Sequence, residues 1–179
     1  MLNKENTVFV LVDVQGKLSN IVYDSKSLIN NLKILIQGLN ILHVPIVWLE
    51  QYPRGLGETN EALTKLLPDI KPIHKITFDA CKNQRFLDAL AAAKRKKVLI
   101  AGIETHICVY QTALGIQSLG YEVQVIADAV SSRTKMNKEI GLHKMFASGI
   151  LPSSVEMALY ELMETAGSSE FKRILELLK

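Results

Sequence analysis

The sequence predicts an α/β fold: a three-layer α/β/α sandwich around a central, mainly parallel sheet. Apolar, β-branched segments recur along the chain, as expected of strands that are buried on both faces. Segments with helical spacing separate them, which is the pattern of a parallel sheet with crossover helices. At 179 residues and 48% hydrophobic content, the chain is long enough for one sizeable core. We therefore expect one domain over residues 1–179.

The first predicted strand is the segment TVFVLVDV, residues 7–14, which is apolar up to an acid at Asp13. Leucines then recur at steps of four and three from Leu28 to Leu42, which gives a helix one apolar face. Asp24 or Ser25 is placed to cap the start of this helix.

The second predicted strand is VPIVWLE, residues 44–50, again apolar almost throughout. The next ten residues, 51–60, contain two glycines and a proline and are predicted to be a loop. A short helix is expected over residues 61–67, because Pro68 ends it. Residues 73–78 form a short predicted strand or extended segment.

Strand and helix continue to alternate in the second half of the chain. Residues 84–94 are rich in Ala and Leu with helical spacing, and KKVLIAGIE, residues 96–104, is a continuous apolar strand. A helix is expected over residues 108–118, because Gly120 just beyond it is a helix stop signal. Residues 121–130 are the next predicted strand.

The C-terminal part completes the pattern. Residues 137–147 are predicted as a helix, and a last short strand in GILPSS runs into a helix capped at Ser153 or Ser154. Residues 169–178 are expected to form an amphipathic tail helix.

Composition narrows the function class. The formal net charge of +3 is spread along the chain, so no nucleic-acid partner is expected, and no apolar run reaches the roughly 20 residues of a membrane span. Two cysteines make no disulfide framework, and the N-terminus is polar without a signal peptide, which predicts a cytoplasmic protein. The apolar content is high for a small monomer and suggests a homo-oligomer.

Ligands bind beyond the carboxyl ends of the strands in a parallel sheet, so polar residues there are candidates for a site. Asp13 ends the first predicted strand, Lys75 lies in the segment 73–78, and Cys108 follows the strand 96–104. A cysteine at a helix N-terminus is expected to have a lowered thiol pKa. A neighbouring carboxylate accepts its proton, and a lysine stabilises the charges. Each residue alone also has an ordinary interpretation: a buried thiol, a turn cap and a surface lysine.

Other chemistries lack support in the sequence. There is no phosphate-binding G-x-x-x-x-G-K-[ST] motif, and Gly55-Leu-Gly57 lacks the third glycine of a dinucleotide site. The four histidines show no metal-ligand spacing, so we expect no metal and no cofactor. Cys81 is a candidate redox partner of Cys108, but the two do not form a C-x-x-C motif.

Four segments taken in order resemble the isochorismatase-like (cysteine hydrolase) family, with the isochorismatase domain-containing proteins the most similar group. VFVLVDVQ resembles the family's first strand with its Asp-x-Gln ending, and LEQYPRGLGET resembles the loop that marks that group. With VFVLVDVQ, three segments complete the four that carry the family resemblance: HKITFDA, residues 74–80; GIETHICVYQTALG, residues 102–115; and GYEVQVIADAVSSR, residues 120–133.

This resemblance implies a fold and a mechanism. The fold is the isochorismatase-like hydrolase fold, and the family's triad falls on Asp13, Lys75 and Cys108. A non-proline cis peptide maps onto Ile103–Glu104, where it directs the backbone N–H groups of Glu104 and Cys108 to one oxyanion. The implied reaction is hydrolysis of a small amide or carbamoyl-type C–N bond through a thioester.

Two departures from the family pattern limit the substrate. Residues 45–60 hold no histidine or aspartate, so the metal site of nicotinamidases is not expected. Leu18 stands where many members have an aromatic residue, and Tyr52 and Phe78 are further candidates for the pocket wall. The alternatives are a catalytically weak or inactive protein that acts through protein interaction, an isochorismatase-type ether hydrolase, and a thiol redox protein.

Overall fold

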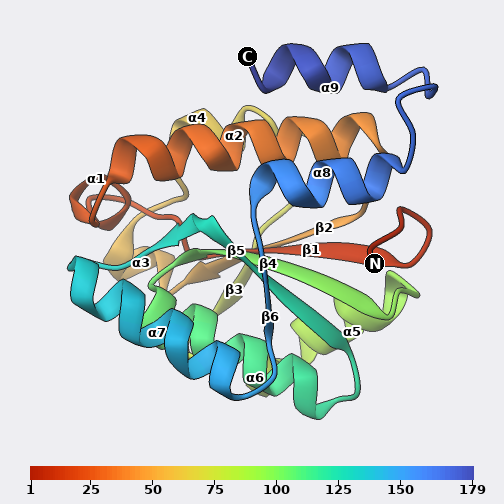
Figure 1. Cartoon of the computed structure of the whole chain (residues 1–179). Helices are drawn as coiled ribbons and strands as arrows, with labels where there is room; N and C mark the ends of the chain where they lie inside the picture. The colour runs from red at the N-terminus through yellow and green to blue at the C-terminus, as the bar shows by residue number, and fades with distance from the viewer.

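A computed structural model describes residues 1–179 and contains one six-stranded sheet in which every pair of neighbouring strands is parallel (Figure 1). The strand order is β3-β2-β1-β4-β5-β6. The strands are β1 (Thr7–Val12), β2 (Ile46–Gln51), β3 (Ile73–Lys75), β4 (Lys97–Ile103), β5 (Glu122–Ser131) and β6 (Leu151–Ser153). β1 and β2 are buried at every residue, because helices cover both faces of the sheet.

Helices cover the two faces of the sheet as separate layers. In Figure 1, α2 and α8 lie above the sheet with α9 outside them, whereas α5, α6 and α7 lie below it. The helices are α1 (Leu18–Ile21), α2 (Ser25–Ile41), α3 (Pro53–Leu56), α4 (Glu61–Thr64), α5 (Gln84–Ala92), α6 (Tyr110–Ser118), α7 (Lys135–Ala147), α8 (Val155–Met163) and α9 (Phe171–Leu177). A 3-10 turn η1 (Ala80–Lys82) and a π-helical turn η2 (Thr105–Val109) complete the chain. The predicted three-layer sandwich is confirmed.

The topology has one switch point, between β1 and β4. The chain passes from β1 outward to β2 and β3, and then crosses back to place β4 on the other side of β1. The connections on the two sides therefore diverge, and a crevice opens beyond the carboxyl ends of these two strands. Asp13 follows β1 and Glu104 follows β4 at this crevice.

The two central strands come unusually close at their carboxyl ends. Val12 is the partner of Gly102 in the register of β1 and β4. Gly102 has φ +123°, and a Cβ built on it would lie 2.1 Å from the Val12 carbonyl oxygen. Only glycine fits this position, so the last residues of both strands are fixed relative to each other.

Several local predictions made from the sequence differ from the structure. Asp24 precedes α2, but it makes no side-chain cap, and its left-handed backbone (φ +48°) differs from the extended conformation usual for a capping residue. Two short helices, α1 and α3, were not predicted, and α3 lies in the expected loop 51–60. The helix expected over residues 108–118 is preceded and partly replaced by η2.

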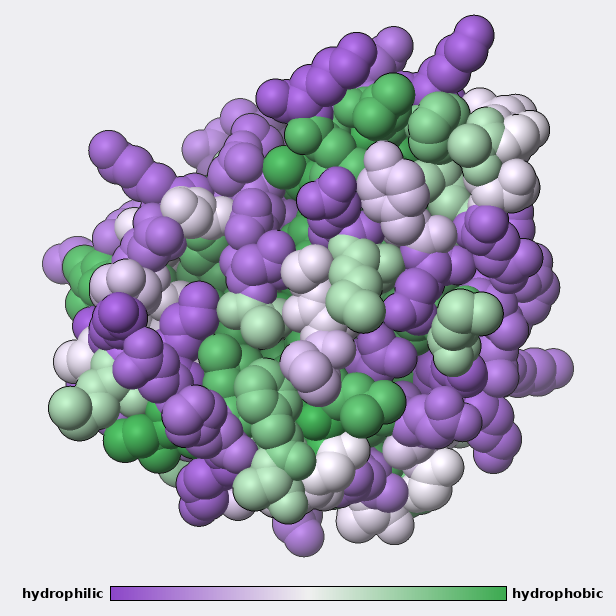
Figure 2. Space-filling model, in the orientation of Figure 1, coloured by the Kyte–Doolittle hydropathy of each residue, from purple (hydrophilic) through white to green (hydrophobic).

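The surface is mixed in character. Figure 2 shows hydrophilic residues around most of this face and hydrophobic residues gathered near its centre, over β6 and α7, and again beneath α9. Leu151 of β6 and Met157 and Tyr160 of α8 are among the exposed large apolar side chains. None of the helices combines the length and the apolar character that crossing a membrane requires.

Candidate active site

The ends of β1 and β3 bring a buried carboxylate and a buried ammonium group into contact. Lys75 Nζ donates a hydrogen bond of 2.7 Å to Asp13 Oδ2. The Lys75 side chain is fully buried and Asp13 is 5% exposed. Lys75 also donates to Gln51 Oε1 at 2.6 Å and to the Thr77 carbonyl at 3.3 Å. An ammonium group has three N–H donors, so these three acceptors fix its position.

One oxygen of Asp13 remains without a partner. Its Oδ1 is buried and accepts no hydrogen bond, while Oδ2 is held by Lys75. Burial raises the pKa of Asp13, and the charge and hydrogen bond of Lys75 oppose that rise. The result is a carboxylate with one free oxygen and a raised affinity for a proton.

Cys108 lies beside this pair, in the fourth residue of η2, and is buried. Burial, with the neighbouring charge of Asp13, raises the pKa of its thiol to about 12, and the positive charge of Lys75 opposes the rise. The predicted lowering of the thiol pKa by a helix N-terminus is therefore wrong. Cys108 does not begin a helix, since η2 starts at Thr105, and burial is the largest cause of its raised pKa.

The chain between β4 and η2 has two distinctive features. The peptide bond between Ile103 and Glu104 is cis. The Glu104 side chain is 8% exposed, and its Oε1 accepts hydrogen bonds from both the backbone N and Nε of Arg133, each 3.1 Å long. Glu104 thus connects the end of β4 to the segment that follows β5.

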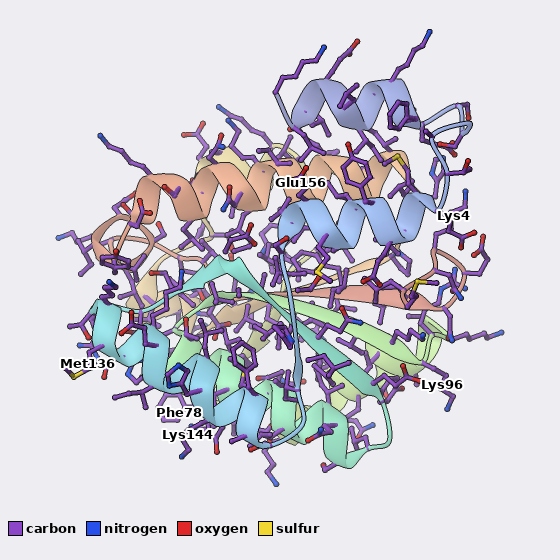
Figure 3. All side chains as sticks on the ribbon, in the orientation of Figure 1. Lys4, Phe78, Lys96, Met136, Lys144 and Glu156 are labelled. Atoms are coloured by element: carbon purple, nitrogen blue, oxygen red, sulfur yellow. The ribbon has the colours of Figure 1, made fainter.

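These groups open onto a cavity of about 300 Å³ at the switch point. It is lined by Asp13, Gln15, Leu18, Gln51, Leu56, Phe78, Ile103, Glu104, Ile107, Cys108 and Arg133. Of the predicted wall residues, Leu18 and Phe78 line this cavity. Tyr52 does not; it lines a second hollow of about 890 Å³, with Arg54, His74 and Lys82. Figure 3 places Phe78 toward the lower left, at the end of the molecule to which the strands' carboxyl ends point.

Sequence reasoning did not single out three polar residues of this cavity. Gln15 Oε1 accepts from Gln51 N at 2.6 Å, and Gln15 Nε2 donates to the Gln51 and Gly57 carbonyls. Gln51 in turn orients Lys75. Gln51 ends β2 as Asp13 follows β1, so its position at a strand end was an available signal. Arg133 follows β5 in the same way.

A second buried network holds the loop that forms one wall. Glu50, 3% exposed, accepts from Thr59 N at 2.8 Å and Thr59 Oγ1 at 2.7 Å. Thr59 Oγ1 also accepts from Trp48 Nε1 at 2.8 Å. Glu50 Oε2 lies 3.3 Å from His74 Nε2. These contacts tie the segment that carries Leu56 to β2.

Comparison with known proteins finds relatives that carry the name isochorismatase. Residues 7–157 match the family described as the isochorismatase domain. The chain is 36% identical over 179 residues to the secreted isochorismatase effector Isc1 of Phytophthora sojae, covering 97% of this chain and 85% of that protein. It is 30% identical over 177 residues to isochorismatase domain-containing protein 2 of Danio rerio, covering 99% and 89%.

A solved structure shares the whole fold. The MAR1 ribonuclease of Caenorhabditis elegans superimposes with a TM-score of 0.92 at 30% sequence identity, covering 99% of this chain and 91% of that one. The arrangement of six parallel strands and flanking helices is thus one that this relative shares.

Proposed function

The chain belongs to the isochorismatase family, and on this basis we propose that it is a cysteine hydrolase that cleaves a small amide or carbamoyl-type C–N bond through a thioester. In this proposal Cys108 is the nucleophile, Asp13 the general base and acid, and Lys75 the group that holds Asp13. The observation that carries it is the free, buried Oδ1 of Asp13 beside the Cys108 thiol.

The first step transfers a proton as the sulfur attacks. With its pKa raised to about 12, the thiol of Cys108 is protonated at neutral pH, so Asp13 Oδ1 accepts the proton while Sγ bonds to the carbonyl carbon. The raised pKa of Asp13 suits this role, because it makes the carboxylate a stronger base. Lys75 stabilises the negative charge that remains in the site.

The carbonyl oxygen becomes negatively charged in this step. We propose that the backbone N–H groups of Glu104 and Cys108 donate to it, with the cis peptide at Ile103–Glu104 setting the direction of the first. The intermediate collapses as the C–N bond breaks, and protonated Asp13 gives its proton to the departing nitrogen, which leaves as ammonia or an amine.

Water completes the cycle. Asp13, again ionised, takes a proton from a water molecule whose oxygen attacks the thioester carbonyl. The C–S bond then breaks, and the proton returns to Cys108. The acid product leaves, and the enzyme is restored without a metal or a cofactor.

The test is hydrolysis of a panel of small amides and carbamoyl compounds by the whole chain and by Cys108→Ala. We expect the variant to lose at least about 10³-fold in kcat with each substrate that responds. Cys81→Ala is the matched control, since Cys81 is a half-buried thiol outside the cavity. Unchanged hydrolysis in Cys108→Ala overturns the mechanism. A covalent adduct at Cys108, seen by mass measurement after rapid acid quench, supports it directly.

Two further activities belong in the same panel. Hydrolysis of isochorismate that survives in Cys108→Ala would support an ether hydrolase instead. A short RNA is included because the C. elegans relative carries the name ribonuclease. No turnover of any compound, together with specific capture of a protein partner, would favour the interaction protein.

We also propose that the chain acts in the cytoplasm as a homo-oligomer. Two free cysteines support a reducing compartment, and exposed Leu151, Met157 and Tyr160 on the edge strand and α8 support subunit packing. Light scattering on the purified chain tests the second point, and a monomeric mass at micromolar concentration would contradict it.

A further inference from the structure

A second hollow lies beside the cavity that contains Cys108, and the two share no lining residue. It has a volume of about 890 Å³, lies over the edge strand β3 between α3 and the turn η1, and is lined mostly by polar and charged side chains. Two of these side chains already face carboxylates, because Lys75 donates to Asp13 and His74 Nε2 lies 3.3 Å from Glu50. The other charged groups of the lining have no such partner.

Two cationic side chains in this hollow are free to bind an anion. Arg54 of α3 and Lys82 of η1 are both exposed, and neither takes part in an ion pair of the chain. Glu58 is the one acid of the lining, so the unpaired groups leave an excess of positive charge. A planar guanidinium group and a compact ammonium group are the two side-chain cations that bind phosphate in proteins.

Tyr52 adds a fixed aromatic surface to the same hollow. Its backbone N donates to the Lys75 carbonyl at 2.8 Å, which ties it to the end of β3. Its ring lies directly against Gly55, where an added Cβ would come within 2.4 Å of ring atom Cε1. The ring therefore packs on α3 only because residue 55 has no side chain, and Tyr52 still remains 52% exposed. A held ring with this much free surface is one on which a planar ligand group can stack.

We propose that this hollow is a second ligand site, which binds a small phosphate monoester with a planar ring, of the nucleoside monophosphate class. Arg54 and Lys82 bind the phosphate group, and Tyr52 stacks on the ring. Glu58 accepts hydrogen bonds from the sugar hydroxyls, a role that suits a carboxylate beside a ribose. Binding here requires neither Cys108 nor turnover, so the inference goes beyond the proposed hydrolysis and stands independently of it.

Calorimetric titration of the whole chain at low ionic strength tests the inference with three probes. AMP carries both the phosphate and the ring, adenosine lacks the phosphate, and inorganic phosphate lacks the ring. We expect AMP to bind with a Kd below about 1 mM, and about tenfold or more tightly than either other probe, because each of these loses one set of contacts. In Cys81→Ala, alkylation of Cys108 by iodoacetamide fills part of the other cavity, and AMP should bind this chain as tightly as before.

Single substitutions assign the contacts. Arg54→Gln and Lys82→Gln should each weaken AMP binding about tenfold, the loss of one charge-assisted bond. Tyr52→Leu should weaken the binding of AMP but not that of inorganic phosphate. Arg85→Gln, an exposed arginine of α5 outside the hollow, should change neither.

Three outcomes overturn the inference. They are AMP binding no tighter than that of inorganic phosphate, AMP binding that is unchanged in both Arg54→Gln and Lys82→Gln, and AMP binding that is lost when Cys108 is alkylated. Failure of the proposed hydrolysis would appear instead as turnover that is insensitive to Cys108→Ala, and it would leave the binding of AMP as it is.

Discussion

Lys75 Nζ lies 2.7 Å from one oxygen of Asp13, and the other oxygen of the same carboxylate is buried without a partner. The two oxygens are therefore not equivalent. One is neutralised by a fixed cation, and in the proposed mechanism the other exchanges a proton with the thiol of Cys108. Burial of both charged groups is tolerated because each N–H of Lys75 has an acceptor, from the residue after β1, from β2 and from the segment after β3.

Asp13→Asn should separate the reactivity of the thiol from catalysis. After burial, the charge of Asp13 is the next largest cause of the raised pKa of Cys108, so its removal lowers that pKa while Lys75 remains. We expect alkylation by iodoacetamide at pH 8 to become about tenfold faster, while hydrolysis falls by about 10² or more. Slower alkylation than in the wild type would contradict this account. Alkylation is measured at Cys108 by peptide mass analysis, and Asp69→Asn, an exposed carboxylate outside the cavity, is the control.

The pH dependence of the wild type follows from the same two groups. Because the pKa of Cys108 is raised to about 12, alkylation should rise about tenfold per pH unit from pH 7 to 10 without a plateau. Hydrolysis needs ionised Asp13 and a protonated thiol, so it should stay level over that range. It should fall on the acid side at a pH above the ordinary pKa of Asp, because that of Asp13 is raised. A plateau in the alkylation rate below pH 9 would contradict this prediction, because it would mean that the thiol of Cys108 ionises at a much lower pH.

The strands were predicted from local patterns, whereas the expectation that Asp13, Lys75 and Cys108 act together came from the family resemblance. Continuous apolar runs mark buried parallel strands, and Asp13 ends such a run. Cys108 was placed on a helix without its π-helical turn, because a turn held by packing against α7 leaves no periodic signal. The partner of Arg133 was unpredictable from spacing, because Glu104 lies 29 residues away and meets it only through the order of β4 and β5.

Gly141→Ala tests whether α7 supports the nucleophile. A Cβ at Gly141 would lie 2.8 Å from the backbone N of His106 and 2.9 Å from its Cα, in the turn that carries Cys108. Since backbone atoms yield less than side-chain tips, α7 must move away. We expect a loss of about 2 kcal/mol in the free energy of unfolding, and a lower kcat. His143→Ala, exposed on the same helix, should change neither. Full stability and activity in Gly141→Ala would show that this contact has no supporting role.

Thr59→Val tests the buried network that anchors the wall of the cavity. Valine keeps the shape of threonine but removes the hydroxyl that donates to Glu50 and accepts from Trp48 Nε1, which leaves that N–H buried without a partner. We expect a loss of about 2 kcal/mol in urea unfolding. Trp48 is the only tryptophan, so its fluorescence reports the change at the site itself. Thr59→Ser keeps the hydroxyl and should lose less than half as much. Equal losses in the two variants would mean that the methyl group, and not the hydrogen bonds to Glu50 and Trp48, stabilises this loop.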